Sequence, residues 1–283
     1  MQVNPRPASR GYHPAAVIMA ELTSTHHDLR LGPAGVVDIC RTDASVSSPF
    51  VLAIHGGAWQ RREYQRIFQT LLWPKIKPLG YALVLATYRL SPEYQFPCAY
   101  DDLTQLLKWL RNNGYSYGLD AARCALLGSS AGAHLAMLLA TRATQELRDI
   151  PAIRGVVQYC GIADLTAQYQ FEETRGHEMV KTFMGVPPMA DPKRYQEASP
   201  LMNLHRAVPP VWMAHGTADE TVPVAQSRAL NEKLISLGHD PVYLEARGLD
   251  HTMLERTTDG PWAEPAVLLF EHDMLRFLKC SLG

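Results

Sequence analysis

The chain has 283 residues, of which 47% are hydrophobic and 19% charged, and its formal net charge is -1. This composition is that of a globular protein with a large apolar core, and the balanced charge argues against a basic surface for nucleic acid or anionic lipid. The five cysteines, at positions 40, 98, 124, 160 and 280, match neither a disulfide framework nor a C-x-x-C metal motif.

The first ten residues are polar and lack the apolar segment of a secretory signal, and no apolar run approaches the roughly 20 residues of a membrane span. We therefore expect a cytoplasmic protein with neither a membrane nor a nucleic acid as partner. The oligomeric state stays open, with a homodimer as one possibility.

Short apolar runs alternate with amphipathic segments from about residue 36 onward, which predicts a mostly parallel sheet with helices on both faces, an α/β fold. The predicted strands are 36–40, 50–54, 82–86, 124–127, 156–159, 211–215 and 242–245. The predicted helices are 64–76, 100–112, 131–143, 224–237 and 263–279.

One domain is expected over residues 1–283. The segment 164–206 interrupts the alternation, because it is long, charged and rich in proline and aromatic residues. Together with residues 1–30 it is predicted to form a small lid, since long ordered loops in compact enzymes commonly cover a site.

The sequence GSSAG at 128–132 follows an apolar run and opens a helix of small residues. The pattern G-x-S-x-G at a strand-to-helix corner predicts that Ser130 is a nucleophile, because the flanking glycines allow the sharp turn that exposes its hydroxyl. The simpler alternative is a serine that caps the helix, a task that Ser129 could equally perform.

A serine nucleophile needs a base within reach and an acid that orients the base. Asp219 follows the predicted strand 211–215, and His251 follows the strand 242–245, so the order serine, aspartate, histidine is the one that such sheets use. Asp164 also follows a strand and competes with Asp219 for the role of the acid.

His239 and His272 are rivals of His251. His239 precedes the last predicted strand and His272 lies within a predicted helix, so neither occupies the loop where the base is expected. His251 is therefore the predicted base.

The sequence HGGAW at 55–59 directly follows a predicted strand and supplies small residues whose backbone N–H groups can face a reacting carbonyl. We assign the N–H groups of Gly57, Ala58 and Ala131 to an oxyanion hole. His55 is expected to pin this loop by hydrogen bonds.

Trp59 is a candidate substrate-pocket residue, with packing under the lid as the alternative. Tyr169, Phe171 and Phe183 in the segment 164–206 could face substrate, but burial of that segment onto the body is the default expectation.

Other polar pairs receive structural interpretations. Asp101 and Asp102 could look like a paired-carboxylate site. The neighbours His26 and His27, and likewise His177 and Glu178, could bind a metal ion, but neither pair has a third ligand at matching spacing. No metal site is therefore predicted.

Five motifs carry a resemblance to a known family: HGGAW at 55–59, YRLSPEYQFPCAYDD at 88–102, GSSAG at 128–132, HGTADETVP at 215–223 and DH at 250–251. They resemble the α/β-hydrolase superfamily, and within it the carboxylesterases related to hormone-sensitive lipase and to kynurenine formamidase. The resemblance implies an eight-stranded sheet whose second strand is antiparallel, and no metal or organic cofactor. It also implies that Asp101 and Asp102 cap and anchor the helix that follows Pro97. The chain departs from the hormone-sensitive-lipase pattern in having HGGAW in place of HGGG and a short N-terminal cap.

The expected activity is hydrolysis of small to medium carboxylic esters through an acyl-enzyme, with Ser130, His251 and Asp219 as the triad. The alternative is an arylformamidase or amidase that uses the same triad. A third possibility, from a different class, is a small-molecule binding protein that kept the fold without turnover.

Overall fold

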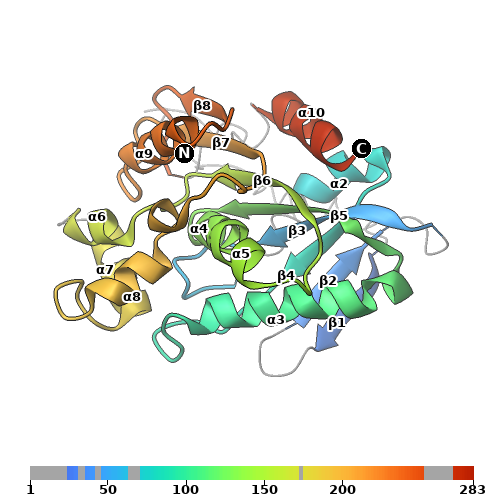
Figure 1. Ribbon diagram of the computed structural model, residues 1–283, viewed down its shortest axis with the longest axis horizontal. Coiled ribbons are helices and arrows are strands. Elements are labelled where there is room, and N and C mark those ends of the chain that lie inside the picture. Colours follow the sequence, from blue (N-terminus) through green and yellow to red (C-terminus); the bar gives the residue numbers. More distant parts are fainter. Residues whose placement is uncertain (1–23, 31–35, 42–45, 63–70, 172–174, 252–269) are drawn as a thin grey trace, which may run out of the picture.

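Eight strands form one sheet within the residues that the structure describes, in the order β1-β2-β4-β3-β5-β6-β7-β8 (Figure 1). The computed structural model describes residues 24–30, 36–41, 46–62, 71–171, 175–251 and 270–283. The strands are β1 (Ser24–Arg30), β2 (Val36–Cys40), β3 (Ser48–Ile54), β4 (Ala82–Ala86), β5 (Leu119–Ser129), β6 (Ile153–Tyr159), β7 (Val211–Gly216) and β8 (Val242–Ala246).

Strand β2 runs antiparallel to both of its neighbours, and all pairs from β4 to β8 are parallel. The predicted eight-stranded, mostly parallel sheet with an antiparallel second strand is therefore confirmed. The seven strands expected from the apolar runs are all present, and β2 and β4 have the predicted bounds.

Strand β1 differs from the sequence prediction, which assigned residues 1–30 to a lid. Residues 24–30 pair with β2 at the edge of the sheet, with register shifts along the pairing. The sequence STHHDLR has no apolar run, because an edge strand is held by hydrogen bonds on one side and needs no continuous apolar pattern. The rest of the N-terminal lid prediction, residues 1–23, lies outside the described residues.

The helices flank the sheet on both faces, as predicted. They are α2 (Trp73–Ile76), α3 (Cys98–Asn113), α4 (Ala131–Leu138), α5 (Thr144–Glu146), α6 (Leu165–Gln170), α7 (Arg175–Met184), α8 (Pro192–Ala198), α9 (Ala225–Ser236) and α10 (Glu271–Leu282). A π-helical turn at Leu139–Ala143 continues α4, and short 3₁₀ turns lie at Lys77–Leu79, Gly114–Tyr117 and Pro200–Asn203. The predicted helical residues 64–70 and 263–269 lie outside the described residues.

Alternate residues of the central strands enter two separate cores. In β3, Phe50, Leu52 and Ile54 join one apolar cluster, and Val51 and Ala53 join the other. The first cluster includes buried residues of α3, α4 and α9, and the second includes those of α2 and α10. This period of two explains why the strands are apolar throughout, since each face of the sheet is covered.

The segment 164–206 folds into α6, α7, α8 and a 3₁₀ turn that pack against the body. The Phe96 N–H donates to the Phe183 carbonyl at 2.9 Å, and Gln168 Nε2 donates to the Thr221 carbonyl at 2.9 Å. The segment therefore contacts both the loop before α3 and the loop that carries Asp219.

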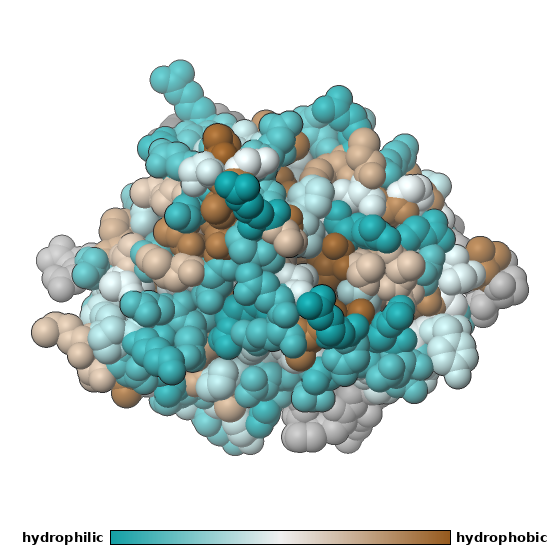
Figure 2. Space-filling model, in the orientation of Figure 1, coloured by the Kyte–Doolittle hydropathy of each residue, from teal (hydrophilic) through white to brown (hydrophobic). Residues whose placement is uncertain are grey.

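The face in Figure 2 is largely hydrophilic over α3, whose exposed residues are polar or charged. Among the described residues, no helix combines the length and the apolar character needed to cross a bilayer.

Candidate active site

The predicted site residues meet at one edge of the sheet because parallel strands end on the same side. The loop 55–59 follows β3, Ser130 follows β5, Asp219 follows β7 and His251 follows β8. Four segments that are distant in sequence therefore converge at the carboxyl ends of neighbouring strands, where open α/β sheets place their ligands.

Ser130 occupies a sharp turn between β5 and α4, with φ of 55° and ψ of -122°. A positive φ is uncommon for a residue with a side chain, and such strain is concentrated at functional sites. The turn brings backbone so close that a Cβ at Gly128 would lie 2.3 Å from the Gly132 carbonyl carbon, and a Cβ at Gly132 would lie 2.0 Å from the Ile54 oxygen. A larger residue at either glycine of the motif would therefore clash with the backbone.

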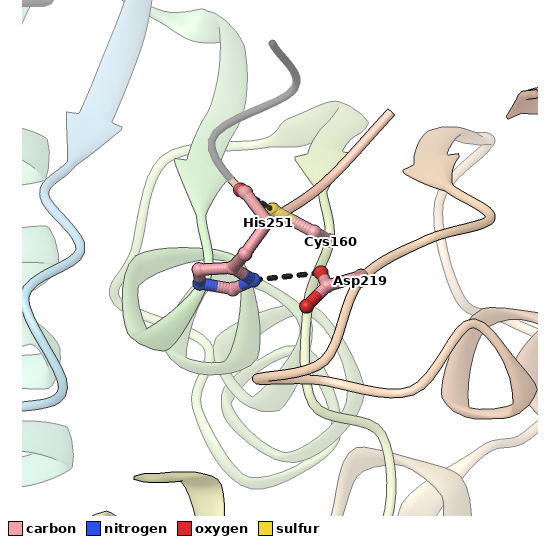
Figure 3. A group of neighbouring side chains, drawn as sticks. All are labelled: Cys160, Asp219 and His251. Atoms are coloured by element: carbon pink, nitrogen blue, oxygen red, sulfur yellow. Dashed lines mark hydrogen bonds and ion pairs between the residues drawn. The ribbon is translucent and has the colours of Figure 1, made fainter. Parts of the chain in front are cut away.

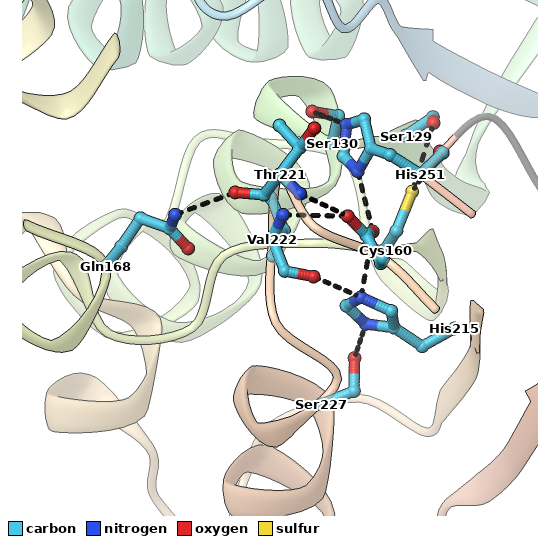
Figure 4. A network of polar contacts seen from close by, with 10 residues as sticks. Ser129, Ser130, Cys160, Gln168, His215, Thr221, Val222, Ser227 and His251 are labelled. Atoms are coloured by element: carbon cyan, nitrogen blue, oxygen red, sulfur yellow. Dashed lines mark hydrogen bonds and ion pairs between the residues drawn. The ribbon is translucent and has the colours of Figure 1, made fainter. Parts of the chain in front are cut away.

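Three side chains form a hydrogen-bonded series at this edge (Figure 4). His251 Nε2 lies 2.9 Å from Ser130 Oγ, and His251 Nδ1 lies 2.7 Å from Asp219 Oδ2. One imidazole therefore contacts the hydroxyl through one nitrogen and the carboxylate through the other.

The Asp219 carboxylate is buried and receives four hydrogen bonds. Oδ1 accepts from the N–H groups of Thr221 and Val222 at 2.9 and 2.8 Å, and Oδ2 accepts from His251 and, at 3.1 Å, from His215 Nε2. Burial would raise the pKa of this carboxyl, but the hydrogen bonds from the two histidines hold it well below its usual range. Asp219 is therefore ionised and fixed in orientation.

The pKa of His251 is shifted in the opposite direction. Burial alone would lower it, but Cys160 and the hydrogen-bonded, charged Asp219 raise it well above its ordinary value. The imidazolium that forms when this ring takes a proton is therefore stabilised.

Cys160 follows β6 and completes a cluster of three potential metal ligands with Asp219 and His251 (Figure 3). Their ligand atoms lie within 4.8 Å of one another, and the Cys160 thiol contacts the His251 carbonyl at 3.5 Å. Two ligands of one tetrahedral zinc would stand roughly 3.3 Å apart, from Zn–N and Zn–O distances of about 2.0–2.1 Å. The 2.7 Å between His251 and Asp219 is instead the separation of a hydrogen bond.

The competing residues have other partners. Asp164 caps α6, where its Oδ1 accepts from the N–H groups of Thr166 and Ala167 at 2.8 and 3.1 Å. His239 contacts the His205 carbonyl at 3.0 Å. The carboxylate that lies beside His251 is that of Asp219.

The loop 55–59 is held in an unusual conformation. Gly57, Ala58 and Trp59 have φ values of 96°, 57° and 58°. The two residues that carry side chains each incur about 1–3 kcal/mol of strain in this region, which the surrounding contacts must offset. His55 Nδ1 contacts the Gly56 carbonyl at 2.7 Å, which agrees with the structural task expected of this histidine.

The Trp59 side chain faces the protein interior. It is 2% exposed, its ring stacks on Phe183 at 4.3 Å between centroids, and its Nε1 donates to His134 Nδ1 at 3.2 Å. This geometry fits the packing alternative better than a role as a substrate-pocket residue, because so little of the Trp59 side chain is accessible. Phe183 is likewise buried, so it attaches its segment to the body.

Asp102 forms an ion pair in place of a two-carboxylate site. Its oxygens accept from the Arg89 backbone N–H at 2.8 Å and from the guanidinium at 2.6–3.0 Å. Asp101 is exposed. The pair fixes the segment before α3 to the helix, as expected of an anchoring residue.

Sequence reasoning missed three side chains that support the site. His215 donates to Asp219 and its Nδ1 lies 2.7 Å from Ser227 Oγ, and His134 bonds to Trp59. His215 and His134 stand next to the motifs HGTADETVP and GSSAG. A polar histidine among apolar residues was the only sign in the sequence that His215 and His134 support the site. The groups to which they bond could be identified only from the fold.

Comparisons with known proteins agree with this architecture. The BD-FAE family profile matches residues 37–234. The esterases LipQ and LipC of Mycobacterium tuberculosis are 31% and 27% identical over 243 and 258 residues, or 79% and 86% of this chain. The chain spans 56% and 63% of their lengths.

A truncated carbohydrate esterase from gut microbiota superimposes with a TM-score of 0.74 at 18% identity, over 93% of this chain and 98% of that one. Such a similarity shows a common fold. The family match covers well over half of the chain, and the sheet has the expected eight strands with an antiparallel second strand. The chain therefore belongs to the BD-FAE family and has the α/β-hydrolase fold.

Proposed function

We propose that this chain is a serine hydrolase that cleaves carboxylic esters of small to medium size. The observation that supports it most is the unbroken hydrogen-bonded series from Ser130 through His251 to Asp219. The esterase names of LipQ and LipC favour an ester over the arylformamide alternative.

The first half-reaction forms an acyl-enzyme. Ser130 Oγ attacks the carbonyl carbon of the ester while His251 Nε2 takes the hydroxyl proton, and Asp219 stabilises the resulting imidazolium. The carbonyl oxygen becomes negative in the tetrahedral intermediate, where the N–H groups of Gly57, Ala58 and Ala131 serve as the proposed donors. Collapse of the intermediate expels the alcohol, which leaves with the proton from His251.

The second half-reaction returns the enzyme to its starting state. Water attacks the acyl carbonyl and gives a proton to His251, and the carboxylic acid leaves as Ser130 recovers that proton. The position of Ala131 at the start of α4 suits the donor role, because the first N–H groups of a helix have no intrahelical partner.

Replacement of the nucleophile tests the proposal. Ser130→Ala should abolish turnover of a short-chain nitrophenyl ester, and a fluorophosphonate probe should label the wild type but not the variant. Ser129→Ala is the matched control, because this neighbouring hydroxyl contacts Cys160 at 3.9 Å and not His251. Full activity in Ser130→Ala would refute the assignment.

Comparison of an aryl acetate with an aryl formamide tests the ester preference. The proposal expects a higher kcat/KM for the acetate. A higher value for the formamide would favour the amidase, and the absence of both turnover and labelling in the wild type would favour a binding protein.

A further inference from the structure

Three consecutive residues of the loop 55–59 adopt positive φ values, and two of them are not glycine. Ala58 and Trp59 have φ of 57° and 58°. A bulky residue such as tryptophan is a genuine outlier in this region, so the conformation persists only where contacts hold it. The contacts that hold Trp59 therefore decide whether the N–H groups of Gly57 and Ala58 keep their directions.

The Trp59 backbone is held by the segment that precedes α3. Its carbonyl accepts from the Ser91 N–H at 2.9 Å and from Ser91 Oγ at 3.2 Å. These bonds fix the carbonyl end of the residue. The side chain is held by a different part of the molecule.

The Trp59 indole is held by α4 and by the segment 164–206. Its Nε1 donates to His134 Nδ1 at 3.2 Å, and its ring lies nearly parallel to that of Phe183, at an interplanar angle of 10°. The His134 ring packs edge-on against both aromatic rings.

The hydrogen bond fixes the tautomer of His134. Because Nδ1 accepts from the indole, the proton is on Nε2, which donates to the Ala198 carbonyl at 2.7 Å. The imidazole is fully buried, and this burial lowers its pKa to about 4, so the ring is neutral at physiological pH. The Trp59 indole N–H therefore donates to His134, and the His134 N–H donates to the Ala198 carbonyl, so both hydrogen bonds point the same way along this series.

His134 is also tied to the nucleophile. It lies one helical turn after Ser130, and its N–H donates to the Ser130 carbonyl at 3.0 Å. The same histidine therefore links the helix that begins beside Ser130, the loop of the proposed oxyanion donors and the segment 164–206.

We infer that Trp59 and His134 are positioning residues, which hold the backbone N–H groups of Gly57 and Ala58 toward the oxygen that becomes negative in the transition state. The inference rests on the proposed esterase function. It assigns a purpose to a buried indole and imidazole whose ring nitrogens bond to each other and to the Ala198 carbonyl. Donors of this kind act on the developing charge, so their misplacement lowers kcat and leaves KM nearly unchanged.

The test removes the indole N–H and keeps an aromatic ring. Trp59→Phe should lower kcat for a short-chain nitrophenyl ester about tenfold, less than the loss of a whole oxyanion donor, with KM changed less than about twofold. The affinity for a boronate, which forms a tetrahedral adduct with Ser130, should fall by the same factor as kcat/KM. Trp73→Phe is the matched control, because Trp73 is equally buried but lies in the core on the other face of the sheet.

Variants of His134 test the other half of the pair. His134→Gln retains one acceptor and one donor, and it should keep kcat within about threefold of the wild type. His134→Leu removes both and should match Trp59→Phe. If His134→Gln has a higher kcat than His134→Leu while the two variants are equally stable to heat, the hydrogen bonds of His134 position the loop, and its packing alone does not explain the effect.

Hydrogen exchange provides a readout that does not depend on turnover. Deuterium uptake by a peptide covering residues 55–61 should be about tenfold faster in Trp59→Phe than in Trp73→Phe. Equal exchange and equal kcat in these two variants would overturn the inference. An inactive, unlabelled wild type would instead refute the proposed function and, with it, the catalytic purpose assigned to Trp59 and His134, whatever the exchange rates of the loop.

Discussion

His215 Nε2 lies 3.1 Å from Asp219 Oδ2, the same carboxylate oxygen that His251 Nδ1 contacts at 2.7 Å. The His215 proton is shared with the Val222 carbonyl at 2.9 Å, and Nδ1 lies 2.7 Å from Ser227 Oγ. In the neutral imidazole with its proton on Nε2, Nδ1 accepts from the Ser227 hydroxyl. The orientation of the carboxylate thus depends on a second histidine, which is fully buried and which Figure 4 shows between Val222 and Ser227.

His215→Ala should lower kcat by between about tenfold and a hundredfold, because Asp219 loses a donor and its orientation toward His251 relaxes. Steady-state kinetics at the optimal pH would measure this. Ser227→Ala is the control, since it removes only the outer hydrogen bond and should change kcat less than about threefold. Wild-type kcat in a folded His215→Ala variant would contradict the prediction.

The pH profile should reflect the raised pKa of His251. Only the neutral ring can accept the Ser130 proton, so kcat/KM should rise about tenfold per pH unit in acid and level off above the imidazole pKa. Because the pKa is raised, the midpoint should lie above about 6.5, the ordinary value for histidine.

Cys160 contributes to this shift, so Cys160→Ala should move the midpoint to lower pH. Cys280→Ala is the matched control, because that thiol is exposed in the C-terminal helix α10. Identical midpoints for the two variants would show that the Cys160 thiol does not influence the histidine.

Buried His134 should make the protein less stable in weak acid. Its folded-state pKa is about 4, against a usual 6.5, so between these values the unfolded chain binds a proton that the folded chain does not. The free energy of unfolding should therefore fall as the pH drops from about 6.5 to about 4, by up to ~3 kcal/mol.

Urea unfolding of the wild type and of His134→Gln over that pH range would measure the difference. The raised pKa of His251 makes the free energy of unfolding depend on pH only above about pH 6.5, and the lowered pKa of Asp219 does so only below about pH 4. Neither group therefore changes the stability between these two values. The difference between the two proteins should shrink toward pH 4. A constant difference would exclude His134 as the cause.

Gly132→Ala should destabilise the fold by about 3 kcal/mol and abolish activity, because the new Cβ would lie 2.0 Å from the Ile54 carbonyl oxygen. Gly238→Ala is an informative control. Gly238 has a φ of +89° but nothing within 4 Å of the added carbon, so only backbone strain of about 1 kcal/mol is expected. Thermal or urea unfolding would compare the two, and equal losses would argue against steric exclusion at Gly132.

Local patterns account for the parts of the fold that the sequence predicted correctly. Strands β2 and β4 had the predicted bounds, since both are short and mostly apolar, and turn signals flank them. Strand β1 was not recognised because its pairing with β2 depends on backbone hydrogen bonds at the sheet edge, which leave no apolar pattern. The strand β5 extends beyond the apolar residues 124–127 to Leu119–Ser129, and its first residue Leu119 pairs with Ser48 of β3.

The amino-acid sequence by itself determined where a nucleophile could stand, because the turn at Ser130 is local and needs glycine at 128 and 132. Only the tertiary structure decided which carboxylate approaches His251 and what the Trp59 indole does. Asp219 and Asp164 both follow strands, and only one of them reaches the imidazole once the sheet has formed. The partner of Trp59 is Phe183, more than a hundred residues away, so its burial depends on packing that no local pattern contains.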